Sequence, residues 1–279
     1  MQQQYILHND EFISTNLPLL KASNRAFKYG DGLFETMRMS NGKLKFPDLH
    51  ADRLRDGMKA LKMEGSILLD TYFLKQKTNE LCRKNKLKDN VRFRLSIYRE
   101  GEGLYTPESN KYGYVLEASP LPSADYELNR KGLILDVYDE ITKPCNIFSN
   151  FKTSSSLLYV MAGLHKKQHK LDDVILLNDK GFICETISSN IFVVYDKQIY
   201  TPALSEGCVS GVMRKVVMQL AKVHEIPIIE AQLNPEVLRQ ADEVFVTNAL
   251  GGIRWVMGYG RKRYFNEFAK QLSGLLNGI

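Results

Sequence analysis

The stretch NRAFKYGDGLFETMR, residues 24 to 38, carries the strongest indication of the fold. Its YGDG segment is a glycine-rich turn, and the FETMRMS segment that follows reads as a strand. The Asn41-Gly42 pair then marks a tight turn that leads into KLKF. The earlier segments YILHN and EFIS also have the composition of strands. We therefore predict a sheet built around this turn in the first part of the chain.

Two amphipathic helices are predicted after this sheet begins. The first starts at Pro47, with His50 and Arg53 three residues apart on one face. Another face of the same helix gathers the apolar residues Leu54, Met58 and Leu61. The second helix is predicted near residues 68 to 86.

The segment NVRFRLSIY, residues 90 to 98, alternates between apolar and polar side chains. The positions on its core side are Val91, Phe93, Leu95 and Ile97. Arg92 and Arg94 lie on the opposite face. The pattern predicts a half-buried strand that presents arginines away from the core.

The segment SPLPSAD, residues 119 to 125, has two prolines and small polar residues and is the best candidate for a linker. We therefore expect an N-terminal α/β domain at 1–118 and a C-terminal domain at 126–279. The elements predicted for the second domain are GLILDVY, a helix at about 154 to 168, DVILLN, FICET, NIFVVY, a helix from Gly211 to about 224, IPIIE, a short helix, EVFVTN and a terminal helix. This order favours an α+β fold with many short antiparallel strands over a regularly alternating, doubly wound sheet.

The composition is that of an ordinary globular chain. Its 279 residues suggest about two domains, and 44% of them are hydrophobic. The net charge of +6 is spread through the chain, and its densest basic stretches, RKNKLK, HKKQHK and RKR, are short. This distribution favours solvated surface charge over a nucleic-acid face. A basic pocket for an anionic substrate stays open, because surplus positive charge concentrates anions.

Cysteine spacing and the N-terminal sequence bear on the compartment. The four cysteines have neither CxxC spacing nor histidine partners at zinc intervals, so we expect free thiols, no metal and a reducing environment. MQQQYILHND lacks the basic start and apolar run of a signal peptide, and no stretch approaches the roughly 18 apolar residues of a membrane span. We expect a cytoplasmic protein without membrane or nucleic-acid partners.

Two ionisable residues stand in unusual surroundings. Lys152 follows Phe148 and Phe151 in a stretch of small polar residues. Most lysines are solvated surface residues, but a catalytic amine needs partial desolvation to lose its proton. Glu185, in FICETISSNIFVV, lies either at a strand end in water or buried against a partner. A lysine that can form a Schiff base and an acid that can pair with a pyridinium nitrogen are the minimum equipment of a pyridoxal-phosphate (PLP) enzyme.

A phosphate group would need a cation and backbone donors. Arg53 is one candidate, although it also reads as an ordinary exposed helix arginine. The segment GCVSGVMR, residues 207 to 214, is another, because its glycines open a helix whose free N–H groups can bind an anion. Many such helix starts are merely turns. Thr247 and Asn248, at the end of EVFVTN, can add donors. The motifs GxGxxG, GxxxxGK[ST], HExxH and GxSxG are missing from the chain.

Together these segments resemble the class IV, or fold type IV, PLP family, which includes branched-chain aminotransferase, D-amino-acid aminotransferase and aminodeoxychorismate lyase. The resemblance runs from about Asn24 to Trp255. It rests on six segments in the family's order: YGDGLFET, HADRL, the Lys152 segment, GFICETISSNIF, TPALSEGCVSGVMR and ADEVFVTNAL. Each segment is weak alone, and six in order are specific.

The resemblance implies two α/β domains with PLP between them, and a homodimer whose partner helps to close the site. Lys152 would hold the cofactor as a Schiff base, Glu185 would face its pyridine nitrogen, and Arg53 would bind its phosphate. The other cofactor-binding positions that the family implies are Ser189, Asn190, Gly211, Val212, Met213, Asn248 and Ala249. Tyr29, Phe34 and Thr36 match substrate-side positions of the family, and we add Arg94, Arg99 and Tyr105 as substrate-binding candidates for the reason given below. Ala249 stands where the branched-chain enzymes tend to carry a phosphate-binding threonine, so that contact is lost or replaced.

Within the family, FET, SGVMR and TNAL resemble aminodeoxychorismate lyase more than the branched-chain enzymes, which tend to have FEGIR, GITR and TGTA. That lyase releases pyruvate from 4-amino-4-deoxychorismate and gives p-aminobenzoate for folate synthesis. Its substrate carries two carboxylates, which suits the arginines Arg92, Arg94 and Arg99 with the nearby Tyr105. These arginines can equally be surface charges.

Three functions therefore stay open for a protein that takes a small amino substrate. They are the lyase, a branched-chain or D-amino-acid aminotransferase, and a catalytically inactive binding protein of the same fold. In both enzymes Lys152 would take the proton from the amine-bearing carbon, and in the lyase Thr36 or a water would assist proton delivery. The intact Lys152 and Glu185 argue against the inactive protein.

Overall fold

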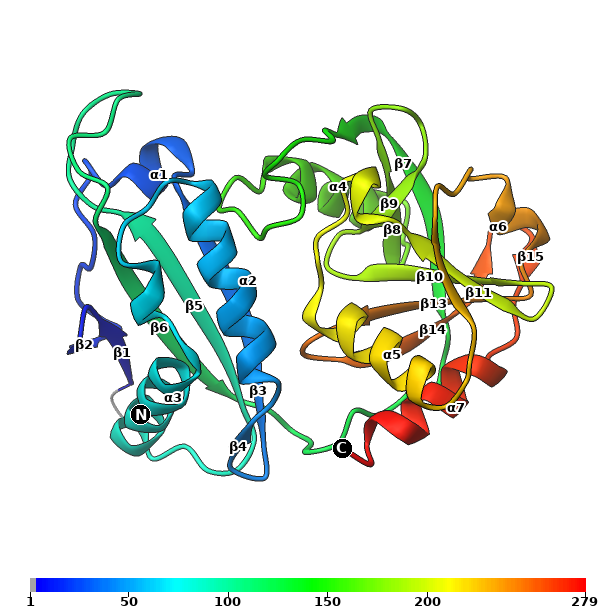
Figure 1. The fold of residues 1–279 in the computed structure, drawn as a ribbon, viewed down its shortest axis with the longest axis horizontal. Coiled ribbons are helices and arrows are strands. Elements are labelled where there is room, and N and C mark those ends of the chain that lie inside the picture. The colour runs from blue at the N-terminus through cyan, green and yellow to red at the C-terminus, as the bar shows by residue number, and fades with distance from the viewer. Residues whose placement is uncertain (1–3) are drawn as a thin grey trace. The chain divides into compact units, whose positions relative to one another are not determined.

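The computed structural model describes residues 4–279 as two compact units, each with its own sheet (Figure 1). The first unit runs to Ala124 and also contains Phe151–Ser156. The second contains Asp125–Asn150 and Leu157–Ile279. The chain therefore leaves the second unit at Phe151–Ser156 and returns to it, an excursion that no sequence pattern indicates. The mixture of helices and strands confirms the predicted α+β class.

The first unit is a six-stranded antiparallel sheet with helices packed on it. Its strand order is β2-β1-β6-β5-β3-β4. The strands are β1 (Tyr5–His8), β2 (Glu11–Ser14), β3 (Gly32–Ser40), β4 (Lys43–Leu44), β5 (Val91–Arg99) and β6 (Tyr112–Pro120). The helices are α1 (Arg25–Tyr29), α2 (Pro47–Ala60) and α3 (Thr71–Asn85), with a 3-10 turn at Ser66–Leu68. Helix α2 packs against β3, and α3 packs against β1 and β6.

The predicted periodicities of this unit are confirmed. The core side of β5 is buried at Val91, Phe93, Leu95 and Ile97. Burial of one such large apolar side chain contributes about 1.5–3 kcal/mol. Helix α2 starts at Pro47, where a proline suits the first turn, and it buries Leu54 and Met58. The polar residues His50 and Arg53 on another face of α2 are buried as well, because both contact Glu35 of β3.

The second unit is built on a nine-stranded sheet with the order β12-β11-β10-β13-β14-β7-β8-β9, and β15 pairs with β14. The strands are β7 (Leu133–Lys143), β8 (Asp173–Asn178), β9 (Ile183–Thr186), β10 (Asn190–Tyr195), β11 (Gln198–Pro202), β12 (Ile228–Ala231), β13 (Glu243–Asn248), β14 (Gly252–Tyr259) and β15 (Lys262–Arg263). The helices are α4 (Leu157–Gln168), α5 (Val212–Val223), α6 (Val237–Gln240) and α7 (Glu267–Leu276), with a 3-10 turn at Leu204–Glu206.

This second sheet differs from the expected antiparallel arrangement. Strand β7 runs parallel to both β8 and β14, and β11 runs parallel to β12. Strands β11, β14 and β15 were not predicted, because glycines and turn residues around them masked their short patterns. Helix α4 begins at Leu157 and not near residue 154, because the residues just before it run alongside β3 of the first unit and are hydrogen-bonded to that strand.

The two glycines of YGDG have different reasons to be glycine. Gly30 ends α1 with a φ of 65°, a left-handed conformation that other residues adopt at a cost. Gly32 begins β3, where an added Cβ would come within 2.4 Å of a carbonyl oxygen of β5. The N–H of Ser154 donates to the Gly32 carbonyl (2.9 Å), and the N–H of Phe34 donates to the Lys152 carbonyl (2.8 Å). The excursion is thereby held along the start of β3.

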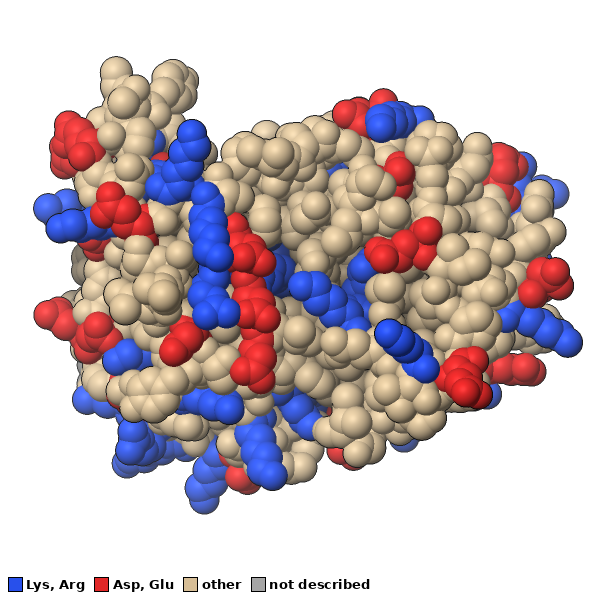
Figure 2. All heavy atoms as spheres, viewed as in Figure 1, with Lys and Arg blue, Asp and Glu red and all other residues tan. Residues whose placement is uncertain are grey.

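Charges of both signs cover the exposed side of α2. Figure 2 shows basic and acidic side chains side by side over this helix, where Arg55 pairs with Asp52 and Lys59 with Asp56. Exposed pairs of this kind contribute about 0–1 kcal/mol. A face of mixed sign is not the basic stripe that nucleic acid selects. Within residues 4–279, no helix combines the length and the apolar composition needed to cross a bilayer.

Candidate functional site

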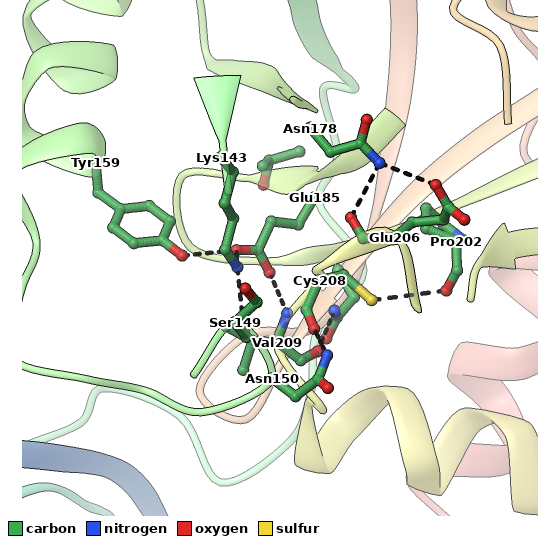
Figure 3. A network of polar contacts seen from close by, with 12 residues as sticks. Lys143, Ser149, Asn150, Tyr159, Asn178, Glu185, Pro202, Glu206, Cys208 and Val209 are labelled. Atoms are coloured by element: carbon green, nitrogen blue, oxygen red, sulfur yellow. Dashed lines mark hydrogen bonds and ion pairs between the residues drawn. The ribbon is translucent and has the colours of Figure 1, made fainter. Parts of the chain in front are cut away.

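Glu185 is the centre of a buried polar cluster in the second unit (Figure 3). It lies on β9 and is only 3% exposed. One carboxylate oxygen, Oε1, accepts hydrogen bonds from Lys143 Nζ (2.5 Å) and from the Tyr159 hydroxyl (2.7 Å). The other, Oε2, accepts from the N–H of Val209 (2.8 Å). Of the two situations that the sequence left open for Glu185, the structure shows the buried one.

Lys143, at the end of β7, is a partner of Glu185 that was not among the predicted site residues. Its ammonium also donates to the Ser149 carbonyl (3.2 Å). Burial by itself lowers the pKa of Lys143, but the negative charge of Glu185 outweighs burial and raises the pKa above its ordinary value. The two side chains therefore form a buried ion pair. No local pattern marks Lys143, because only the pairing of β7 with β8 and of β8 with β9 brings it to Glu185.

The other titratable neighbours of this pair are held neutral. Burial raises the pKa of the Tyr159 hydroxyl, and the charge of Glu185 raises it further. Burial also raises the pKa of the Cys184 thiol, and it raises that of Cys208 to about 12. The four cysteines are free, as predicted. Thiols in such surroundings do not supply the thiolate that nucleophilic catalysis needs.

The chain after Val209 leads to the start of α5. Gly211 is the residue before the helix, and no side chain caps this end. An added Cβ at Gly211 would come within 1.9 Å of Asn190 Oδ1, while the Asn190 amide donates to the Val209 carbonyl (2.8 Å). The first N–H groups of the helix, those of Val212 and Met213, have no partner within the helix. Together with the helix dipole they make this end attractive to an anion.

Thr247 and Asn248 lie beside this helix start. Thr247 is opposite Asn190 in the pairing of β13 with β10. Its hydroxyl is buried and has no hydrogen-bond partner within residues 4–279. Buried polar atoms are normally bonded, so an unpartnered one indicates a missing ligand or water. The Asn248 amide donates to Ser189 Oγ (2.9 Å), and its oxygen accepts two N–H groups of the following turn.

These features fit a phosphorylated pyridine. The start of α5 and the Thr247 hydroxyl suit a phosphate, and Glu185 suits a protonated ring nitrogen. An ionised carboxylate has about four acceptor positions. Three donors occupy Glu185, which leaves one position on Oε2. The second unit contains all the cofactor-binding positions that the family implies apart from Arg53 and Lys152, namely Glu185, Ser189, Asn190, Gly211, Val212, Met213, Asn248 and Ala249.

The predicted lysine lies in the first unit, on the face of β3 opposite the core. Lys152 Nζ is 4.6 Å from the centre of the Phe34 ring. The guanidinium carbon of Arg94 is 4.0 Å from the same centre. Thr36 follows Phe34 on this face and pairs opposite Arg94. The structure thus gathers four of the predicted site residues on one side of the sheet.

Arg53 is buried in the first unit, and its interpretation as an exposed helix arginine is wrong. Its Nε and Nη2 donate to the two oxygens of Glu35 at 2.7 and 2.6 Å, and His50 Nδ1 lies 2.7 Å from Glu35 Oε2. Burial raises the pKa of Glu35, but the charges of Arg53 and His50 outweigh burial and lower it to about 2. The sequence did contain a signal, because Glu35 shares its strand face with the core residues Leu33 and Met37.

The remaining predicted substrate-side residues differ in burial, since Arg99 is buried and Tyr105 is exposed. Arg99 is buried, and its guanidinium donates to Asp31 (2.9 Å) and to Asn110 (2.6 Å). It therefore holds the loop after β5 in place. The rings of Tyr29 and Tyr105 are 5.6 Å apart, and Tyr105 is 90% exposed. The roles of these three residues toward a substrate stay predictions.

Related proteins carry several activities in their names. An aminodeoxychorismate lyase of Bacillus subtilis is 25% identical over 87% of this chain and 82% of its own length. A D-alanine aminotransferase of Listeria innocua is 25% identical over 87% of this chain and 83% of its own length. The branched-chain-amino-acid aminotransferase-like protein 2 of Arabidopsis thaliana is 26% identical over 87% of this chain, which spans 43% of that protein.

Solved structures show the same fold. The branched-chain amino acid aminotransferase of Escherichia coli matches with a TM-score of 0.86 and 24% identity, over 99% of this chain and 96% of its own. An aminotransferase of Brucella abortus, solved with PLP bound, matches with a TM-score of 0.86 and 20% identity, over 98% of both chains. These likenesses confirm the predicted fold type IV. The family described as amino-transferase class IV matches residues 32–258, and the chain therefore belongs to the class IV aminotransferases, as its sequence segments predicted.

Proposed function

We propose that this protein is a PLP-dependent lyase that converts 4-amino-4-deoxychorismate into p-aminobenzoate and pyruvate, a step toward folate. The observation that carries the cofactor assignment is the buried carboxylate of Glu185 beside the uncapped start of α5. When bound, PLP supplies an aldehyde that condenses with amines and a ring that takes up an electron pair. Membership of the class IV family supports this assignment.

The second unit offers partners for both ends of the cofactor. Glu185 would accept a hydrogen bond from the protonated ring nitrogen at the position left on Oε2. The N–H groups of Val212 and Met213 would bind phosphate oxygens at the positive end of α5. The unpartnered hydroxyl of Thr247 would supply the side-chain donor that Ala249 lacks. Ser189, Asn190, Gly211 and Asn248 would shape this end of the site.

Arg53 stays assigned to the phosphate. Its fork is fixed by the two hydrogen bonds to Glu35, which set the direction of the guanidinium plane. An arginine held in this way loses little further freedom when it binds an anion. We therefore assign to Glu35 and His50 the task of orienting Arg53.

Lys152 is the residue that we assign to covalent attachment of the cofactor and to proton transfer. Once a substrate amine has replaced it, its amine would take the proton from the amine-bearing carbon. Thr36, on the same face of β3, would help to deliver a proton. Arg94 lies beside them and suits a carboxylate of the substrate.

The choice of the lyase rests on a few segments, FET, SGVMR and TNAL, and on the lyase among the relatives. A branched-chain or D-amino-acid aminotransferase is the alternative, because relatives also carry those activities in their names. The same lysine and carboxylate serve either reaction. The substrate decides which products form.

The test starts from the absorption spectrum of protein purified with PLP. We expect a band of lysine-bound cofactor and, after addition of 4-amino-4-deoxychorismate, equal amounts of p-aminobenzoate and pyruvate. Conversion of the band to that of pyridoxamine phosphate by branched-chain or D-amino acids alone would make the protein a transaminase. Protein that binds no PLP would refute the cofactor assignment and favour the inactive alternative.

We also propose a homodimer, as the family resemblance implies, in the cytoplasm. Light scattering coupled to gel filtration should give twice the 31.9 kDa of one chain. A monomer at the concentration used for the activity assay would contradict this proposal.

A further inference from the structure

Lys143 occupies a place that the proposed function leaves without a role. Its Nζ lies 2.5 Å from Oε1 of Glu185, the carboxylate assigned to the ring nitrogen. The two side chains are 7% and 4% exposed, so water screens their charges poorly. The simple alternative is structural, because a buried ion pair can also fix β7 relative to β9.

Lys143 cannot take the place of Lys152 while Glu185 holds the ring nitrogen. The carbon that bears the aldehyde and the ring nitrogen lie at opposite positions of the pyridine ring. A lysine in direct contact with Glu185 therefore meets the nitrogen end of the cofactor and not the aldehyde. Its position is that of a second cation beside the nitrogen.

We propose that Lys143 is a positioning residue of the cofactor site, whose ammonium shares Glu185 with the ring nitrogen and weakens that nitrogen's hold on its proton. The inference rests on the proposed function, because it requires Glu185 to face the nitrogen. The ammonium and the Tyr159 hydroxyl occupy Oε1, and the Val209 N–H occupies part of Oε2. The orientation of the carboxylate is thereby fixed, and its charge is shared.

The sign of the effect follows from the charges. Lys143 and Glu185 form a neutral pair, so a protonated ring nitrogen adds a net positive charge to a buried cluster. Without the ammonium, the same nitrogen would meet an uncompensated carboxylate and would keep its proton more firmly. Nearby charges of this kind shift a pKa by about 1–3 units. The ring of the wild-type holoenzyme is therefore a more moderate electron sink than a lone carboxylate would make it.

The other groups that face the pair do not mask this effect. Burial raises the pKa of Tyr159 on α4, of Cys184 on β9, and of Cys208 and Cys145 in the adjoining loops. These groups stay neutral while the ring nitrogen titrates. Other charged groups near the cluster are the buried Glu206, which accepts from Asn178, and Asp179 and Lys180 beside Cys145. Arg214 of α5 and Glu230 of β12 form an ion pair with each other.

The test compares four holoenzymes that carry PLP labelled with ¹⁵N in the ring: the wild type, Lys143→Gln, Lys143→Arg and Lys131→Gln. Glutamine keeps a hydrogen-bond donor and removes the charge, whereas arginine keeps the charge. Lys131 is an exposed lysine of the same unit and serves as the control. The ¹⁵N chemical shift and the absorption spectrum are followed against pH. In Lys143→Gln the nitrogen should keep its proton to a pH at least about one unit higher, and the other two variants should titrate like the wild type.

An unchanged ring-nitrogen pKa in Lys143→Gln would overturn the inference and leave Lys143 as a structural ion pair. If Lys143→Gln does not fold, the protonation state of the ring nitrogen in the wild-type holoenzyme still tests the inference. A ring nitrogen that stays fully protonated wherever the wild-type holoenzyme is folded would overturn the inference, and loss of the proton within that range would support it. Failure of the proposed function gives a different result, which is wild-type protein that holds no PLP on Lys152.

Discussion

The carboxylate of Glu185 is shared by an ammonium, a phenol and a backbone N–H. A carboxylate is costly to bury unless donors surround it, and these three offset that cost before any cofactor is bound. At the scale of single residues, the second unit itself therefore prepares the site that we propose for the ring nitrogen. A change at Glu185 also disturbs Lys143, so its effects on catalysis and on stability have to be separated.

Replacement of Lys152 by alanine should abolish turnover, because the covalent attachment point and the proton-transferring amine are lost together. Borohydride reduction of the wild-type holoenzyme should fix the cofactor on one lysine, and peptide mass mapping should find it on Lys152. The Lys143→Gln protein, as a matched control, should carry the same label on Lys152. Normal turnover in Lys152→Ala, or a label on Lys143, would contradict the assignment.

Glu185→Gln should retain the cofactor but lose orders of magnitude in rate, because an amide does not hold the proton on the ring nitrogen. It also leaves Lys143 buried without a counter-charge, and broken buried pairs of this kind cost about 3–5 kcal/mol. Urea unfolding and steady-state kinetics measure the two effects separately. The double variant with Lys143→Gln should recover part of the unfolding free energy and none of the rate. An unchanged rate in folded Glu185→Gln would show that the carboxylate does not serve the nitrogen.

At the scale of elements, β3 presents different chemistry on its two faces. Its core face carries Glu35 under the polar side of α2, and its other face carries Phe34 and Thr36 beside Lys152. The ion pair of Glu35 with Arg53 therefore lies on the core face of the strand, where it supports the packing of α2 and orients the arginine that we assign to the phosphate. Disturbance of this pair should show first in stability.

The pKa of Glu35 is lowered from 4.5 to about 2, so its ion pair stabilises the fold above pH 4.5, and this contribution is lost as the pH falls through about 2. A difference of this size corresponds to roughly 3 kcal/mol. Glu35→Gln should flatten the pH dependence of the unfolding free energy in this window, as measured by urea titrations at several pH values. Glu11→Gln, at an exposed position, should keep it. An equally steep dependence in Glu35→Gln would argue against the pair as its source.

The start of α5 is tested by Gly211→Ala. An added Cβ would come within 1.9 Å of Asn190 Oδ1, so either the Asn190 side chain, which is bonded to the Val209 carbonyl, or the helix start has to move, and the affinity for PLP should fall. Gly163→Ala in α4 is the matched control, because its Cβ meets nothing within 4 Å and should be neutral or stabilising by up to about 1 kcal/mol. Absorbance titration of the two apoproteins with PLP gives the comparison. Equal PLP affinities of the Gly211→Ala and Gly163→Ala proteins would show that the start of α5 does not bind the cofactor.

At the scale of the whole molecule, the family and the α+β class could be predicted because six segments occur in order along the chain. Strand β5 and helix α2 were also clear, since periodicity marks the buried face of an element. It does not name the element's neighbours, so the parallel pairings of β7 were missed. Lys143 was missed for the same reason, because its partner lies 42 positions away along the chain. The burial of Arg53 was predictable in principle from Glu35 on the core face of β3.

The excursion of Phe151–Ser156 limits how the gene can be divided or recombined. The backbone passes between the units after Ala124, Asn150 and Ser156, so no single cut separates two self-sufficient halves. A fragment that begins at Asp125 would encode Lys152 but lack the strand along which its segment is held. A chimera of two relatives that is joined only near residue 124 would seat one parent's lysine segment on the other parent's sheet. Additional crossovers after Asn150 and after Ser156 would keep each parent's lysine segment together with the same parent's strand β3.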